Sequence, residues 1–163
     1  KKMSFHKSYI EELYNRYAQR LYFTSLRITA NSVEAEEVMH DTFMKYHTFH
    51  KKETIDNIEK WLTSVCIRKS IDVLRARKKE EIMFECTESC EDESDTENVK
   101  YTVEKIREAL AKLPDGYRII LTLHLFEGYD YSEIAQITNL KESSVRSQYM
   151  RAKNRLAATL KEL

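Results

Sequence analysis

The scarcity of glycine and proline restricts this chain more than any other property of its sequence. Two glycines and one proline among 163 residues leave few positions for tight turns, which favours long helices. Hydrophobic residues make up 42% of the chain, enough for small cores but not for one large core. The sequence therefore predicts an all-α fold, with one domain or two small ones.

Charged residues divide the chain into three parts, although its formal net charge is zero. Residues 1–79 have a net charge of +6, residues 80–100 have −8, and residues 101–163 have +2. The acidic stretch cannot bury enough apolar surface to fold alone, so it is most simply a flexible linker. The alternative is a mimic of nucleic acid that occupies a basic channel until it is displaced. We therefore predict two small helical domains joined by a flexible linker.

The carboxy-terminal part has the pattern of a helix-turn-helix. Gly128 ends an apolar helical run, and Asp130 with Glu133 has the spacing of a capping box at the start of a short helix. Asn139 tolerates the left-handed turn that joins this short helix to a long one. A plain three-helix bundle is the alternative, but the short first helix, the brief turn and the serines that follow favour the helix-turn-helix.

The second helix of this motif is expected over residues 141–160 and has two distinct faces. Its apolar side chains recur at helical spacing at Val145, Tyr149, Ala152 and Leu156. The opposite side presents mainly small polar and basic groups and consists of Ser143, Ser147, Met150, Arg151 and Asn154, with Ser144 and Arg146 flanking it. Small hydroxyl side chains at a helix start let the backbone N–H groups approach a phosphate, so we predict that this helix binds DNA.

The amino-terminal part is expected to form three or more helices. Apolar and aromatic residues from Phe5 to Leu26, Tyr9 among them, keep helical spacing and are predicted to be core. Asn31 and Glu34 have capping-box spacing, and the helix that follows has more acidic residues than capping requires. This acidic face is either simply solvated or a docking surface for a basic partner, and the residues alone leave both interpretations open.

The last helix of the amino-terminal part is expected to begin at a cap formed by Asp56 and Glu59. Arg68, Asp72 and Arg75 follow at helical spacing, so Asp72 can pair with both arginines and hold them towards phosphates or base edges. The aromatic and basic loop before this helix, residues 49–54, suits an unstacked base, although an ordinary exposed loop has a similar composition.

The sequence predicts no enzyme, no cofactor and no metal site. It has no glycine-rich phosphate loop and no serine nucleophile elbow. Cys86 and Cys90 lie four residues apart without a second cysteine pair or a nearby histidine, and the three histidines between positions 40 and 50 form no ligand pattern. Three cysteines fit a reducing compartment, and we expect neither a secretory signal nor a membrane span.

The order of these motifs resembles the extracytoplasmic-function group of sigma-70 factors, the promoter-recognition subunits of bacterial RNA polymerase. The matching segments are AEEVMHDTF, the aromatic-basic loop, a helix that begins with WL and closes with DVLR, the acidic linker, EGYDYSEIAQI and SSVRSQYMRAKNRL. The resemblance extends from about Ile10 to Leu160. It implies region 2 at residues 1–79, an acidic linker at 80–100, and region 4 at 101–163.

The resemblance implies three contact surfaces. The acidic helix would dock on the coiled coil of the polymerase clamp through Glu37, Val38, His40 and Asp41. The loop and the helix after it would read and open the −10 element through Lys51, Lys52, Lys60, Ser64, Arg68, Asp72 and Arg75. The carboxy-terminal module would contact the polymerase flap and read the −35 element as duplex DNA through Ser143, Ser144, Arg146, Ser147, Gln148, Met150 and Arg151.

Three positions depart from the family pattern. Arg68 replaces a frequent asparagine, which changes the expected base preference, and Gln148 replaces a frequent basic residue, which removes one phosphate contact. Lys141 stands where a serine usually caps the recognition helix, so that helix is expected to begin one or two residues later.

The family also implies core RNA polymerase, promoter DNA and an anti-sigma factor as partners, a bacterial cytoplasmic location, no small-molecule substrate and no membrane insertion. A stand-alone helix-turn-helix regulator that binds DNA without polymerase is the main alternative, but it leaves the acidic helix and the aromatic loop without a role. A helical adaptor that binds polymerase without DNA is a further alternative.

Overall fold

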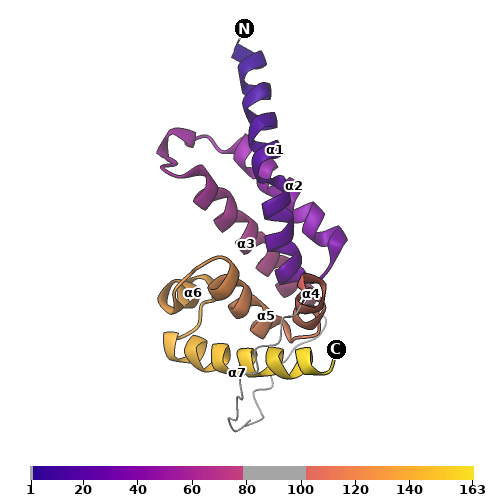
Figure 1. The fold of residues 1–163 in the computed structure, drawn as a ribbon. Coiled ribbons are helices and arrows are strands. Elements are labelled where there is room, and N and C mark those ends of the chain that lie inside the picture. Colours follow the sequence, from indigo (N-terminus) through magenta and orange to yellow (C-terminus); the bar gives the residue numbers. More distant parts are fainter. Residues whose placement is uncertain (1, 79–101) are drawn as a thin grey trace. The chain divides into compact units, whose positions relative to one another are not determined.

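The computed structural model describes residues 2–78 and 102–163, with side chains from Tyr9 onward, and every element in this part is helical (Figure 1). The chain divides into two compact units, Lys1–Ala76 and Arg77–Leu163. The predicted all-α architecture with two helical domains is confirmed. The predicted linker, with Cys86 and Cys90, lies outside the described residues.

Three long helices form the amino-terminal unit: α1 (Lys2–Thr29), α2 (Ser32–Thr48) and α3 (Ile58–Lys78), with a short 3-10 helix, η1 (Lys52–Thr54), before α3. Because only two residues separate α1 from α2, these helices lie antiparallel and contact each other extensively. Their shared core is mainly aliphatic and aromatic and contains Leu13, Leu21, Val38, Met39, Phe43, Tyr46, Leu62 and Cys66.

Small polar side chains join α1 to α3. The Ser70 hydroxyl lies 2.8 Å from the Ser25 hydroxyl, and the Cys66 thiol donates to the Leu21 carbonyl at 3.4 Å. Ser25 and Ser70 are fully buried, so both helices present a small residue at this contact. These polar groups have partners inside the core, which avoids the cost of burying an unpaired hydroxyl.

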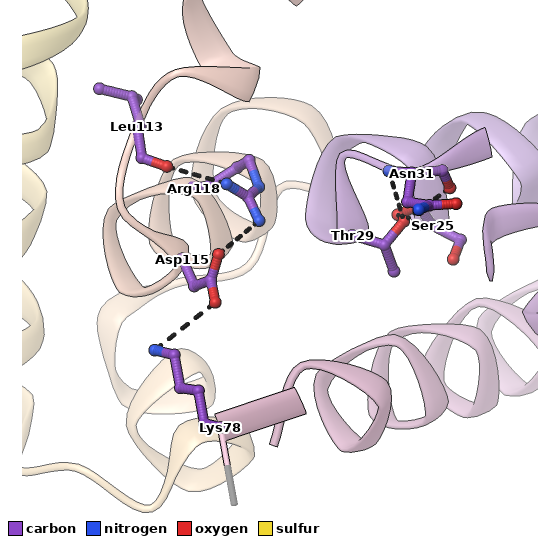
Figure 2. A network of polar contacts seen from close by, with 7 residues as sticks. All are labelled: Ser25, Thr29, Asn31, Lys78, Leu113, Asp115 and Arg118. Carbon is purple, nitrogen blue, oxygen red and sulfur yellow. Dashed lines mark hydrogen bonds and ion pairs between the residues drawn. The ribbon is translucent and has the colours of Figure 1, made fainter. Parts of the chain in front are cut away.

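The turn between α1 and α2 contains an unusual backbone conformation. Ala30 has φ 53°, in the left-handed region that favours glycine. Asn31 then caps α2, since its side-chain oxygen accepts from the Val33 and Glu34 N–H groups at 3.0 and 3.1 Å. The Asn31 N–H donates to the Thr29 hydroxyl at 3.4 Å, which ties the cap back to the end of α1 (Figure 2).

Two expectations for this unit are wrong. Asn57, not Asp56, caps α3: its side-chain oxygen accepts from the Lys60 N–H at 2.9 Å. Tyr9 is 47% exposed rather than core, because the first turns of α1 extend past the other helices of its unit (Figure 1). The helical spacing of the stripe is correct, but the neighbouring helices cover only its later part.

The carboxy-terminal unit contains α4 (Val103–Ala111), α5 (Asp115–Leu121), a π-helical turn η2 (Thr122–Phe126), α6 (Tyr131–Thr138) and α7 (Glu142–Lys161). The long α7 contacts α4, α5 and α6 and closes the core of the unit. That core contains Leu110, Leu113, Leu121 and Ala152, with Ile106, Tyr117, Tyr149 and Leu156 packed against it.

A buried arginine joins the loop before α5 to that helix. Arg118 is 3% exposed and donates to the Leu113 carbonyl at 2.8 Å and to the Asp115 carboxylate at 2.6 Å (Figure 2). Burial lowers the pKa of Arg118, and the charge of Asp115 opposes that shift. The guanidinium therefore has charged and neutral acceptors that compensate for its removal from water.

The apolar run after Pro114 does not continue as a regular α-helix. The Glu127 N–H donates to the Thr122 carbonyl at 3.1 Å, a spacing of five residues that defines the π-helical turn. Gly128 follows with φ 73° and ends the helix at the predicted place. The sequence pattern predicted where this helix ends but not the extra residue in its last turn.

Candidate nucleic-acid interface

The predicted helix-turn-helix is formed by α6 and α7. The Asp130 carboxylate accepts from the Glu133 N–H at 2.8 Å, and the Glu133 carboxylate accepts from the Asp130 N–H at 2.9 Å, which confirms the capping box. Asn139 follows α6 in the left-handed conformation, as predicted, with φ 57°. Residues 139–141 separate the two helices, so the turn has the short length typical of this motif.

The predicted recognition helix, α7, begins at Glu142, although the Lys141 side chain makes no capping hydrogen bond. The expectation that the helix begins one or two residues later is therefore wrong. Backbone bonding explains the result, because the Val145 N–H reaches the Lys141 carbonyl at 3.0 Å without help from a side chain. The first N–H groups of α7 are consequently left for solvent or a phosphate.

The two faces of α7 match the prediction except at Asn154, which is half-buried. Val145 and Ala152 are fully buried and attach the helix to its unit. The predicted DNA-contacting residues with exposed side chains are Ser143, Arg146, Ser147, Met150 and Arg151, whereas Ser144 and Gln148 are half-buried. The exposed residues share the side of α7 that points away from the core. One groove of a DNA duplex can therefore contact most of the predicted DNA-binding residues at once.

A cavity of about 500 Å³ lies beside the predicted −10 loop. Lys52 is part of its lining, and its ammonium group donates to the His47 carbonyl at 3.1 Å and lies 5.2 Å from the centre of the Tyr46 ring. Phe49 is held at the cavity by Trp61, whose ring centre is 5.2 Å away. The site therefore combines aromatic surface with a positive charge, and Lys51 is exposed next to it.

The remaining lining residues include Tyr9 and Ile10 from α1, and of these Tyr9 was predicted to be core. Burial, reinforced by Tyr9, raises the pKa of the Tyr46 hydroxyl. No local pattern links Tyr9 to residues almost forty positions later, so only the packing of α1 against α2 reveals its place.

The predicted −10 residues on α3 form one stripe. Lys60, Arg68, Asp72 and Arg75 are exposed, and Ser64 is half-buried between them. Asp72 lies 3.5 Å from an Arg75 nitrogen, but no ion pair joins it to Arg68 in the part of the chain that the structure describes. The structure thus supports one of the two predicted pairings of Asp72.

Three of the four residues predicted to bind polymerase lie on the exposed side of α2. Glu37, His40 and Asp41 face away from the core, and Asp41 pairs with Lys69 of α3 at 3.1 Å. Val38 does not belong to this surface: it is 3% exposed and packs in the core. One residue turns an α-helix by about 100°, so Val38 points inward while its neighbour Glu37 points outward.

The described residues form neither a metal-binding cluster nor a membrane-spanning helix. Residues 2–78 and 102–163 contain no group of three or more histidine, cysteine or acidic side chains placed to hold a metal ion. Within the same ranges no helix combines the length and apolarity that crossing a bilayer requires.

Two family models match the two units of this chain. Sigma-70 region 2 matches residues 13–80, and Sigma-70 region 4 matches residues 103–156. The ECF RNA polymerase sigma factor SigM of Bacillus subtilis is 29% identical over 153 residues, which cover 91% of this chain and 93% of SigM. The chain belongs to the extracytoplasmic-function group of the sigma-70 family. This sigma factor is therefore a transcription initiation factor that binds core RNA polymerase and promoter DNA.

Other similar proteins agree with the family. The ECF RNA polymerase sigma factor SigL of Mycobacterium tuberculosis is 26% identical over 156 residues, covering 93% of this sigma factor and 88% of SigL. The sigma factor RpoE of Bartonella quintana, solved with the anti-sigma factor NepR, has a TM-score of 0.61 at 20% identity and 93% and 96% coverage. CnrH, solved with the cytosolic domain of CnrY, has a TM-score of 0.58 at 19% identity and 96% and 90% coverage. The two structures establish similarity of fold.

Proposed function

We propose that this sigma factor reads the −35 element as duplex DNA through the exposed face of α7. The single observation that supports this assignment most is the division of α7 into two sides. Val145 and Ala152 attach one side to the core, while Arg146, Ser147 and Arg151 project from the part of the helix next to the turn. A helix held in this way can enter a major groove with its first turns facing the bases.

The −10 element is read and opened, in this proposal, by residues 49–54 together with α3. The cavity beside the loop offers the Phe49 ring for stacking and the Lys52 ammonium for charge neutralisation, which an unstacked base and its phosphate require. Lys51, Lys60, Ser64, Arg68, Asp72 and Arg75 extend this surface along the loop and α3. Melting then depends on binding energy, since capture of a flipped base compensates for its loss of stacking.

Core polymerase contacts two separate surfaces in this proposal. Glu37, His40 and Asp41 on α2 dock on the clamp coiled coil, and the carboxy-terminal module contacts the flap. The exposure and negative charge of Glu37 and Asp41 support the first contact. We assign region 2 to residues 1–79, the acidic linker to 80–100 and region 4 to 101–163.

The chemistry of transcription belongs to the polymerase, so this sigma factor is itself not an enzyme and acts in the bacterial cytoplasm. An anti-sigma factor is its expected regulator. The solved complex of RpoE with the anti-sigma factor NepR supports that expectation, because it contains a chain of similar fold bound to such a partner.

Run-off transcription with purified bacterial core polymerase and a promoter library tests the proposal. Defined transcripts should appear only when this sigma factor is added, and permanganate should modify unpaired thymines near −10. Arg146→Ala should abolish most −35-dependent transcription. Lys161→Ala is its matched control, because it removes an equal charge from the far end of the same helix and should leave transcription unchanged.

The alternatives give different results. A stand-alone regulator would bind duplex DNA tightly without polymerase and would yield no sigma-dependent transcript. An adaptor would keep its activity when Arg146 and Arg151 are replaced, whereas a sigma factor would lose promoter use. Equal transcription by the wild type and by Arg146→Ala from −35-dependent promoters would refute the role of α7.

A further inference from the structure

Arg146 is held by two groups on the surface of the helix-turn-helix. One of its terminal nitrogens lies 2.7 Å from the Glu142 carboxylate, one turn earlier on α7. Its guanidinium carbon also lies 5.3 Å from the centre of the Tyr131 ring, which comes from α6. The side chain nevertheless remains 62% exposed. An exposed arginine is thus restrained in direction while most of its donors still face solvent.

The Tyr131 ring is itself fixed from beneath. It stacks on His124 with ring centres 4.8 Å apart and planes 23° from parallel, and the Tyr149 ring lies 5.6 Å away. His124 packs edge-on against Tyr149 at 4.7 Å. Three different elements, η2, α6 and α7, therefore supply the three rings of this cluster, and the cluster joins the two helices of the motif.

The π-helical turn sets the place of His124 in this cluster. His124 Nδ1 donates to the Tyr129 carbonyl at 2.8 Å, and the Tyr129 N–H bonds to the Leu123 carbonyl at 3.0 Å. These bonds attach the imidazole to the loop that leads into α6. The His124 ring beneath Tyr131 therefore has little conformational freedom. The face of the Tyr131 ring that contacts Arg146 is fixed with it.

We propose that Tyr131 and Glu142 are positioning residues for Arg146, holding its guanidinium ready to contact a base pair in the −35 element. This inference rests on the proposed role of Arg146 in DNA reading. A planar guanidinium stacks on an aromatic face and donates from a rigid fork, and the Glu142 bond occupies only part of that fork. An unrestrained arginine side chain loses conformational entropy when it binds DNA, whereas a side chain that is already restrained in the free protein loses less.

A positioning role for Tyr131 can be distinguished from a general structural role. If Tyr131 only stabilised the fold, its loss would weaken recognition at every −35 base pair to a similar degree. If it positions Arg146, its loss affects the base pair that Arg146 reads and leaves the others unchanged. A double-mutant cycle measures that difference directly.

The experiment uses the holoenzyme, assembled from core polymerase and the full chain. Transcription is measured on templates with every base pair at each −35 position. Arg146→Ala first identifies the base pair whose preference depends on Arg146. Tyr131→Leu removes the ring, Tyr131→Phe retains it without the hydroxyl, and Glu142→Gln removes the carboxylate charge from an exposed position where unfolding is not expected. Tyr131→Leu is also combined with Arg146→Ala.

We expect Tyr131→Leu and Glu142→Gln each to lower discrimination at that base pair by about two- to tenfold, the range for ordering one long side chain. Tyr131→Phe should match the wild type, and Tyr131→Leu should have no further effect in the Arg146→Ala background. Unchanged discrimination in both Tyr131→Leu and Glu142→Gln would overturn the inference. So would an equal loss at every position, or an additional loss in the double variant. If Arg146→Ala itself alters no base preference, the proposed role of Arg146 fails first and the positioning role fails with it.

Discussion

The Lys69 ammonium group lies 3.1 Å from the Asp41 carboxylate and so joins α3 to α2. Asp41 belongs to the surface assigned to polymerase, whereas Lys69 adjoins the stripe assigned to the −10 element. Their side chains are 65% and 32% exposed, so the pair contributes at most about 1 kcal/mol to folding stability. The ion pair therefore connects the two proposed contact surfaces without being needed for the fold.

Asp41→Asn should weaken binding to core polymerase by about five- to tenfold while the melting temperature changes little. The reason is that the substitution removes a charge from the docking face, and one such charge contact is worth roughly 1 kcal/mol. Competition between variant and wild type for a limiting amount of core polymerase measures the effect.

Lys69→Gln is the matched control, because it breaks the same ion pair and leaves the Asp41 charge in place. It should preserve core binding. Equal losses in both variants would show that the ion pair, and not the Asp41 charge, is what polymerase binding requires.

Arg118→Met should destabilise the carboxy-terminal unit by about 2–3 kcal/mol, because the buried Leu113 carbonyl loses its side-chain donor and Asp115 loses its bond to the guanidinium. Arg118→Lys should recover only part of the loss, since one ammonium cannot reproduce both bonds of the fork. Urea unfolding of the full chain, followed by circular dichroism, measures the difference. A Lys variant as stable as the wild type would show that charge alone suffices at this position.

Ala30→Gly should stabilise the amino-terminal unit by up to about 1 kcal/mol, since the left-handed backbone at φ 53° is strained for alanine and free for glycine. The same exchange within a helix, Ala18→Gly, should destabilise it by about 1 kcal/mol. Thermal unfolding of both variants is the measurement. A loss of stability at both sites would mean that the added freedom of the unfolded chain outweighs the relief of strain.

Tyr9→Ala should reduce promoter opening at −10 with little effect on folding, because Tyr9 lines the cavity while about half of its surface is exposed. Tyr9→Phe retains the aromatic wall and should open promoters like the wild type. Permanganate reactivity of the −10 thymines, compared at equal occupancy of core polymerase, reports the effect. Normal promoter opening by Tyr9→Ala would show that the Tyr9 side chain takes no part in capturing the flipped base.

Features that depend on residues close in sequence were predicted well. The capping box of Asp130 and Glu133 and the left-handed Asn139 each require only a few neighbouring residues. Where two suitable caps compete, as Asp56 and Asn57 do, the pattern does not decide between them, because the helix phase set by packing makes the choice. The all-α fold follows from the same local signals, repeated along the chain.

Features that depend on packing could not be read from the sequence. Val38 lies within an acidic helix, and its inward direction follows from which side of α2 meets α1. The approach of Tyr9 to the −10 loop and the stacking of Arg146 over Tyr131 join residues on different helices. No spacing rule encodes such contacts, since each depends on the angle and distance between two helices.

The π-helical turn at Thr122–Phe126 has a consequence for comparing this sigma factor with its relatives. A π-helical turn accommodates one residue more than an α-helical turn of the same span, so it amounts to a single-residue insertion absorbed within a helix. A homologue that lacks this residue would have a regular helix there with the flanking side chains in the same directions, but an alignment without a gap would be displaced by one residue, or about 100° about the helix axis. An alignment without a gap would then pair His124 with a residue that points in another direction, so evolutionary counterparts of the aromatic cluster must be sought in structures and not in aligned columns.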